Sequence, residues 1–199
     1  MNTHIRCVAL SAALIALQGC FSSGSGREAK LWTVECPVPS PVAAAPKAGE
    51  GTPKQTVRLG QVSVASPWDG DCIMVRRPDG SLARDPYNKF AAAPTALLKG
   101  PVMALAAGEG SFGRIMPPVT SASPDAILEV CVSDLSLDCT GARREASVAL
   151  SAALVSGSGR KVIAEGEGSA KADATSGDYS ASFSEAFSAA AKAAFSKMK

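Results

Sequence analysis

Two long stretches of alternating apolar and polar residues constrain the fold of this 199-residue chain more than any other feature. The first covers 126–137 (AILEVCVSDLSL) and the second covers 144–155 (REASVALSAALV). Because successive side chains of a strand point to opposite faces, each stretch predicts a strand with one apolar face, and together they predict a hairpin. The turn at 157–159 (GSG) leads into a third predicted strand at 160–168. The second face of the middle strand carries only small side chains, namely Ser147, Ala149, Ser151 and Ala153.

Shorter strands and turns precede this meander. The stretch 57–65 (VRLGQVSVA) predicts a strand whose alternation changes phase at Gly60, as a β-bulge would produce. Asp-Gly pairs in the turns PWDGD and PDG stand on both sides of 72–77 (CIMVRR) and predict hairpins there. The stretch 31–36 (LWTVEC) predicts a short first strand, and the Pro-rich stretch that follows it cannot enter the centre of a sheet.

Two segments have helical periodicity. The first runs from Phe90 to residue 105, with Pro94 suited to a first turn and Pro101 expected to break the helix. The second lies at the C-terminus, where Ser182 and Glu185 are spaced as a capping box. Its apolar stripe consists of Phe183, Phe187, Ala191, Ala194 and Met198. We therefore expect an α+β two-layer sandwich, with a mostly antiparallel sheet and two helices packed on one face.

The N-terminus carries a short apolar run that ends at a cysteine. The run at 8–17 is about half the length that spans a bilayer, roughly 20 residues, and is typical of a signal-peptide core. It ends in Leu17-Gln18-Gly19-Cys20, which resembles the bacterial lipoprotein signal. The alternative is an ordinary signal peptide with a chance cysteine. The resemblance implies cleavage before Cys20 and acylation of its thiol, and two or three acyl chains anchor a protein stably.

Four parts follow from these features. Residues 1–19 are the expected signal peptide, 20–30 a lipidated Ser/Gly-rich tether, 31–54 a short strand with a Pro-rich linker, and 55–199 the globular α+β domain. Phe21 stands where, in enteric-type bacteria, an aspartate retains lipoproteins at the inner membrane. The resemblance therefore implies a lipid anchor in the outer membrane, with the domain facing the periplasm.

Composition excludes several classes of function. The only histidine, His4, leaves with the signal peptide, which excludes histidine-dependent catalysis and His-containing zinc sites. Of the 20 basic residues only Arg6 is lost, so 19 remain against 18 acidic ones, and such a balance does not favour nucleic acid as a partner. Glu165 and Glu167 share a strand face but have no evident pocket. We predict no catalytic residue, no metal and no cofactor.

The cysteines of the expected mature domain predict disulfide bonds. An oxidising compartment and an even number of thiols favour two bridges over a metal site, because the chain has no C-x-x-C pair. Free buried thiols are the alternative, and the three possible connectivities stay open. The candidates are Cys36, Cys72, Cys131 and Cys139.

The order of these elements resembles the ABC-type transport auxiliary lipoprotein family, which includes the lipoprotein of the paraquat-inducible system. The motif is CIMVRRPDGSLARDPYNKFAAAPTALL, and its most specific block is Met74–Leu98. The matching positions are Val75-Arg76, Gly80, Tyr87-Asn88, Phe90 and Pro94. The chain departs from the family in having Phe90 where Trp is usual, and PWDGD before the second strand. The resemblance implies a non-enzymatic outer-membrane partner of an ABC transporter and its mammalian-cell-entry-type (MCE-type) lipid-binding protein.

Four residues of this block are candidates for binding the partner, namely Arg76, Arg84, Tyr87 and Phe90. Exposed hairpin charges are the alternative for the two arginines, and seating of the first helix on the sheet is the alternative for the two aromatics. Self-association stays open. The alternative functions are assistance in assembling another outer-membrane component, such as a β-barrel or lipopolysaccharide inserter, and an anchored enzyme.

Overall fold

The computed structural model describes residues 28–36, 55–108, 112–116, 118, 121–159 and 161–198. The predicted signal peptide, Cys20, most of the tether and the linker at 37–54 lie outside these ranges. The strands are β1 (Lys30–Trp32), β2 (Val57–Val64), β3 (Cys72–Arg76), β4 (Leu82–Phe90), β5 (Ile115–Met116), β6 (Ala126–Asp138), β7 (Glu145–Ser156) and β8 (Val162–Asp173). The helices are α2 (Pro94–Leu97), α3 (Lys99–Gly108) and α4 (Tyr179–Ser196). Within the described ranges, no helix has the length and apolar character needed to cross a membrane.

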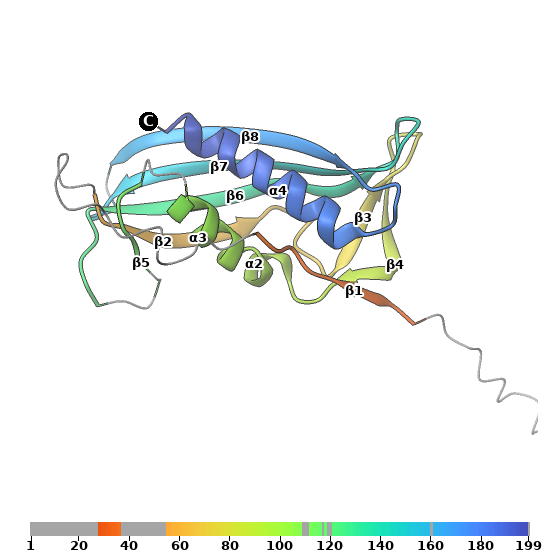
Figure 1. The fold of residues 1–199 in the computed structure, drawn as a ribbon, viewed down its shortest axis with the longest axis horizontal. Helices are drawn as coiled ribbons and strands as arrows, with labels where there is room; N and C mark the ends of the chain where they lie inside the picture. The colour runs from red at the N-terminus through yellow and green to blue at the C-terminus, as the bar shows by residue number, and fades with distance from the viewer. Residues whose placement is uncertain are drawn as a thin grey trace, which may run out of the picture.

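One long strand, β6, organises the sheet (Figure 1). On one side it pairs antiparallel with β7, which pairs antiparallel with β8, and this confirms the predicted meander. On its other side, β6 pairs in parallel with β2 along its first half and with β3 along its last residues. β4 then pairs antiparallel with β3 and parallel with β1, while β5 pairs in parallel with β2.

The prediction that the sheet is mostly antiparallel is wrong. Among the described strands, four pairings are parallel and three are antiparallel, so the sheet is mixed. The error comes from the PWDGD turn, because β2 and β3 do not form a hairpin across it but both run parallel to β6. The PDG turn does close the predicted β3–β4 hairpin, and Gly80 takes a φ of 81° there. The combination of sheet and helices is confirmed, but β1, β3 and β4 form a twisted arm, so the molecule is not a clear two-layer sandwich (Figure 1).

The predicted bulge at Gly60 is present. The register between β2 and β6 shifts between Leu59 and Val62, so the buried side chains before and after Gly60 reach the same face. A Cβ at Gly60 would lie 2.5 Å from Cγ2 of Ile127, which explains why glycine occupies the bulge.

The helices begin and end at other residues than the sequence indicates. The first segment is divided at Leu98 into α2 and α3, because Pro101 fits the first turn of a new helix better than the interior of a continuous one. α4 begins three residues before Ser182, and its N-cap is Asp178, whose carboxylate accepts a hydrogen bond from the amide of Ala181 at 3.1 Å. The predicted capping box is therefore wrong. Ser182 instead donates its hydroxyl to the carbonyl of Asp173 at 2.7 Å.

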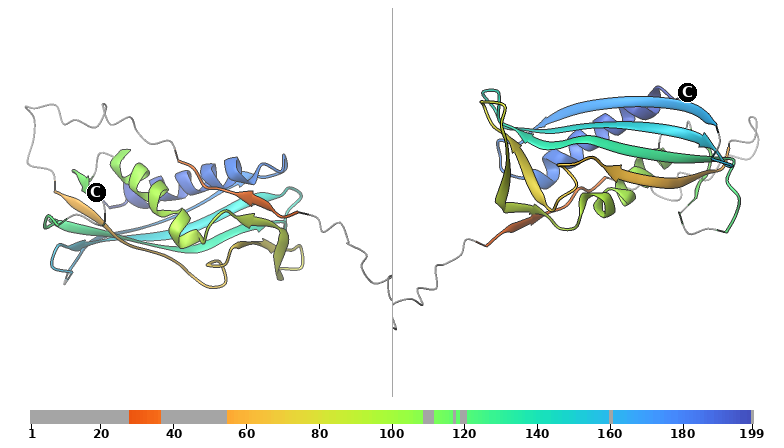
Figure 2. Two further views of the ribbon diagram at one scale, coloured as in Figure 1. Left: turned by 90° about the horizontal axis from the view of Figure 1, so that it is seen from below. Right: turned by 180° about the vertical axis from the view of Figure 1, so that it is seen from behind.

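The helices lie against one face of the sheet (Figure 2). α4 crosses β7 and β8, and its phenylalanines Phe183, Phe187 and Phe195 are fully buried. Phe183 and Phe195 make edge-to-face contacts with Phe90 and Phe112, with ring centroids 5.3 and 5.4 Å apart. The opposite face of the sheet, named here the helix-free face, carries no helix of the described part of the chain.

Candidate docking surface

The helix-free face is built mainly from alternate residues of β6, β7 and β8. On β7, Val148, Leu150 and Leu154 point toward α4 and are buried, so the small side chains between them point the other way and are half-buried. Glu165 and Glu167 of β8 are exposed beside them, directly opposite Ala153 and Ser151. This face is therefore broad, polar at its edge and low in relief along β7.

A shallow hollow of about 190 Å³ lies on this face. It is lined by Gln61, Ser63, Glu129, Val130, Cys131, Ser151 and Ala153. A second hollow of about 300 Å³ lies where β2, β8 and the end of α4 meet. Glu165 and Glu167 line neither of these hollows. In the described ranges, no group of three or more His, Cys, Asp or Glu side chains is arranged to hold a metal ion.

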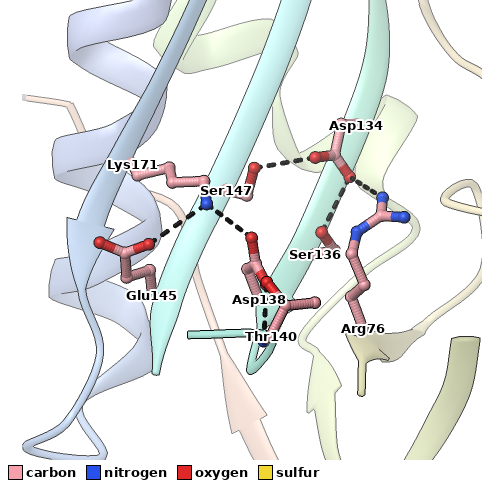
Figure 3. Close-up of polar contacts among 8 residues, drawn as sticks. All are labelled: Arg76, Asp134, Ser136, Asp138, Thr140, Glu145, Ser147 and Lys171. Atoms are coloured by element: carbon pink, nitrogen blue, oxygen red, sulfur yellow. Dashed lines mark hydrogen bonds and ion pairs between the residues drawn. The ribbon is translucent and has the colours of Figure 1, made fainter. Parts of the chain in front are cut away.

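A polar network crosses the helix-free face beside the β3–β4 arm (Figure 3). Asp134 is its first centre, since its carboxylate accepts hydrogen bonds from the hydroxyls of Ser136 and Ser147, each at 2.8 Å. The guanidinium of Arg76 lies 3.8 Å from the same carboxylate and 5.7 Å from the ring centroid of Trp68. Arg76 is thus held between a carboxylate and an aromatic face, which fixes its direction.

Asp138 is the second centre of the network. Lys171 of β8 donates to its carboxylate at 2.6 Å, and Thr140 donates through its hydroxyl at 2.6 Å and its amide at 2.9 Å. These hydrogen bonds, Lys171 first, hold the pKa of Asp138 well below its usual range. Lys171 also pairs with Glu145 at 3.2 Å, and the two carboxylates raise its pKa. The network therefore joins β6, β7 and β8 across their exposed face.

The structure separates the four predicted partner-binding residues. Arg84 is exposed on β4 and is paired directly with Met74, two residues from Arg76, so it lies on the helix-free face. Tyr87 is 46% exposed, whereas Phe90 is only 3% exposed. Phe90 packs against Phe183, so it helps to seat α4 on the sheet.

The structure does not show the predicted disulfides, and all four candidate cysteines are free thiols in it. Cys36 follows β1 and is buried, and burial raises the pKa of its thiol to about 11. Cys131 is exposed on β6, where its paired neighbours are Ser63 and Ser151.

The residues of the polar network were not predicted from the sequence. Asp134, Ser136 and Asp138 share one face by alternation, and the register shift between Val132 and Asp134 puts that face on the helix-free side. The break in apolar alternation at 133–134 was the available signal. Aligning the predicted hairpin across it would have placed Ser136 opposite Ser147, as observed.

Comparison with known proteins gives a likeness of fold. No family model matches the chain, and no curated protein matches it significantly. The crystal structure of protein XCC0632 from Xanthomonas campestris, described with the family model DUF330, superposes with a TM-score of 0.54 at 23% identity, over 67% of this chain and 77% of that one. The chain shares the fold of XCC0632. At this identity, the likeness extends to the fold alone.

Two other solved structures superpose less closely. One is an uncharacterized protein, with a TM-score of 0.49 at 14% identity over 60% of this chain and 73% of its own. The other is the PelC L103M dodecamer from Paraburkholderia phytofirmans, with a TM-score of 0.41 at 10% identity over 73% of this chain and 93% of its own.

Proposed function

We propose that this protein is a non-enzymatic lipoprotein, anchored in the outer membrane through Cys20, that serves as the auxiliary component of an ABC/MCE-type transport system. Its role is to dock the periplasmic lipid-binding partner at the outer membrane. The observation that carries the proposal is a lipoprotein-type signal sequence that ends at Cys20. It precedes a domain whose β3–β4 hairpin contains the arginines and the tyrosine of the family-like block. Anchoring raises the local concentration of such a domain, so a weak contact suffices.

The helix-free face supports docking of a protein through shape and chemistry. Its small side chains on β7 let the backbone of a partner approach closely, and its polar network supplies charges whose directions are already fixed. Preorganised side chains lose little conformational entropy on binding. Arg84 extends this face toward the β3–β4 hairpin and is exposed.

Pull-down from crosslinked cells tests the proposal. The wild-type protein should recover a periplasm-spanning protein with an MCE-type lipid-binding domain. Arg84→Glu should reduce that recovery without lowering the melting temperature, because Arg84 is exposed. The matched control is Lys161→Glu, an exposed basic residue near the β7–β8 turn, which should leave recovery unchanged.

Other outcomes of the same pull-down contradict the proposal. Recovery that Arg84→Glu leaves unchanged removes this surface as the docking site. Recovery of only a β-barrel assembly or lipopolysaccharide-insertion component assigns the protein to outer-membrane assembly instead. Arg76→Glu is unsuitable as a probe, because Arg76 lies between Asp134 and Trp68 and its reversal should lower the melting temperature.

A further inference from the structure

Large apolar side chains are exposed mainly at the two ends of the described domain. Leu31 of β1 is 65% exposed, the highest value among the large apolar residues described, and Tyr87 of β4 is 46% exposed. Val162 and Ile163 are exposed at the start of β8. In Figure 1, β1 and the bend of β4 lie at one end of the long axis, while the start of β8 lies at the other end.

Leu31 and Tyr87 belong to the paired strands β1 and β4 and are both exposed. Trp32 stacks on Tyr179 of α4, with ring centroids 5.2 Å apart, and donates its indole N–H to Asn88 at 2.9 Å, so Trp32 and Asn88 face the helix. Leu31 is the neighbour of Trp32 in the strand and therefore faces away from α4. Its paired residue is Lys89, and Tyr87 precedes Lys89 by two residues in β4. Two exposed apolar residues thus belong to neighbouring strands at this end of the domain, which is named here the β1–β4 corner.

The charges around the corner are mixed and largely paired. Lys89 forms an ion pair with Asp71 at 3.3 Å, and the carboxylate of Asp85 accepts from the amide of Tyr87 at 2.9 Å and from the side chain of Asn88 at 2.8 Å. Lys30 is exposed, with its ammonium 6.0 Å from the ring centroid of Trp32. Tyrosine is enriched at the level of lipid headgroups, and an exposed leucine near it adds apolar area there. Glu28 is exposed in the same stretch, so apolar contact rather than net charge must dominate.

The length of the tether limits how far the corner can lie from the membrane that holds the acylated Cys20. β1 begins at Lys30, ten residues after Cys20, and ten residues reach at most about 35 Å when fully extended. We propose that the β1–β4 corner, through Leu31 and Tyr87, rests in the headgroup region of the bilayer that holds the acylated Cys20. This inference rests on the lipid anchor of the proposed function. The contact orients the domain, leaving the remainder of the helix-free face for a protein partner.

Photolabelling of the lipidated protein tests this contact. The wild-type chain is reconstituted into vesicles of phosphatidylethanolamine and phosphatidylglycerol that contain a small fraction of phosphatidylethanolamine with a photoreactive headgroup. After irradiation, lipid adducts are mapped by mass spectrometry. We expect adducts on the peptides that contain Leu31 and Tyr87. Leu31→Ser combined with Tyr87→Ser should reduce labelling there by about tenfold, because each apolar side chain buried among lipid contributes substantially to the partition.

The matched control is Val162→Ser combined with Ile163→Ser, which removes an exposed apolar pair at the opposite end and should leave the corner's labelling unchanged. Three outcomes contradict the proposed contact between the β1–β4 corner and the bilayer. These are equal labelling of both ends, labelling confined to the β8 end, and no labelling of the domain. Flotation of the vesicles separates the two hypotheses. If the protein floats with the vesicles but the corner is unlabelled, the contact of the corner is contradicted and the lipid anchor at Cys20 is not. If the protein does not float, the lipid anchor itself is contradicted.

Discussion

At the scale of single residues, two glycines of β8 determine how closely α4 approaches the sheet. A Cβ at Gly166 would lie 2.1 Å from the carbonyl oxygen of Ala194, and one at Gly168 would lie 2.0 Å from that of Ala190. Backbone atoms cannot move aside as a flexible side chain can. The helix backbone therefore lies directly on the strand backbone at these two positions, and Ala190 and Ala194 are themselves fully buried.

Gly168→Ala should destabilise the protein by about 1–3 kcal/mol or more, because the added methyl group must displace α4 from the sheet. The urea midpoint of unfolding measures the effect. Gly70→Ala is the matched control, since nothing lies within 4 Å of a Cβ at that position. Equal midpoints for the two variants would show that α4 does not contact β8 as described.

Asp138→Asn should lower the free energy of unfolding at neutral pH by about 1–3 kcal/mol, because the variant loses a charged hydrogen bond to Lys171. The pKa of Asp138 is lowered in the folded protein, so its contribution is present above the unfolded pKa of about 3.9 and is lost as the pH falls below that value. The difference between wild type and variant should therefore shrink as the pH is lowered from 5 toward 2, as denaturant unfolding at several pH values can measure.

The control for Asp138 is Asp69→Asn, which changes an exposed carboxylate in the turn between β2 and β3. It should change stability little at any pH. A difference between wild type and Asp138→Asn that stays constant over the acid range would contradict a contribution from the ionised carboxylate.

At the scale of elements, periodic patterns predicted the β6–β7–β8 meander and the buried stripe of α4. The phase change at Gly60 also predicted the bulge in β2, because alternation reports directly on which face is buried. Ends were harder to predict. β8 continues to Asp173 because Ala172 still faces the core, although the predicted strand ended at residue 168. Alanine and serine carry too little hydropathy contrast to mark a strand.

Asp178→Ala should destabilise α4, and with it the protein, by about 1 kcal/mol, because the carboxylate caps the amide of Ala181. Glu185→Ala serves as the comparison, since Glu185 is the acidic member of the predicted capping box and is exposed. Thermal unfolding followed by circular dichroism measures both. A larger loss of stability for Glu185→Ala than for Asp178→Ala would favour the predicted capping box of Ser182 and Glu185 over the N-cap at Asp178.

At the scale of the whole molecule, the features that were not predicted from the sequence depend on pairing between strands that are distant in the chain. No local signal shows that β2 and β3 lie end to end along β6, since an Asp-Gly turn is equally compatible with a hairpin. The same limitation applies to the candidate surface. Phe90 and Tyr87 are close in sequence, yet one is buried under α4 and the other is exposed, because β4 bends between its pairings with β3 and β1.

The mature protein, denatured without reductant, should contain four reactive thiols, at Cys36, Cys72, Cys131 and Cys139. Titration with a thiol reagent counts them, and the same count after reduction is the control. A rise in the count on reduction would show a disulfide and would contradict the free thiols of the structure.

The central claim is that a lipid-anchored domain docks a transport partner, and crosslinked pull-down with wild-type and Cys20→Ser proteins tests it most directly. Removal of the anchor should leave the melting temperature of the domain unchanged but should greatly reduce recovery of the MCE-type partner, since tethering raises effective concentration. Equal recovery with both proteins, or recovery of no such partner by the wild type, would contradict the claim.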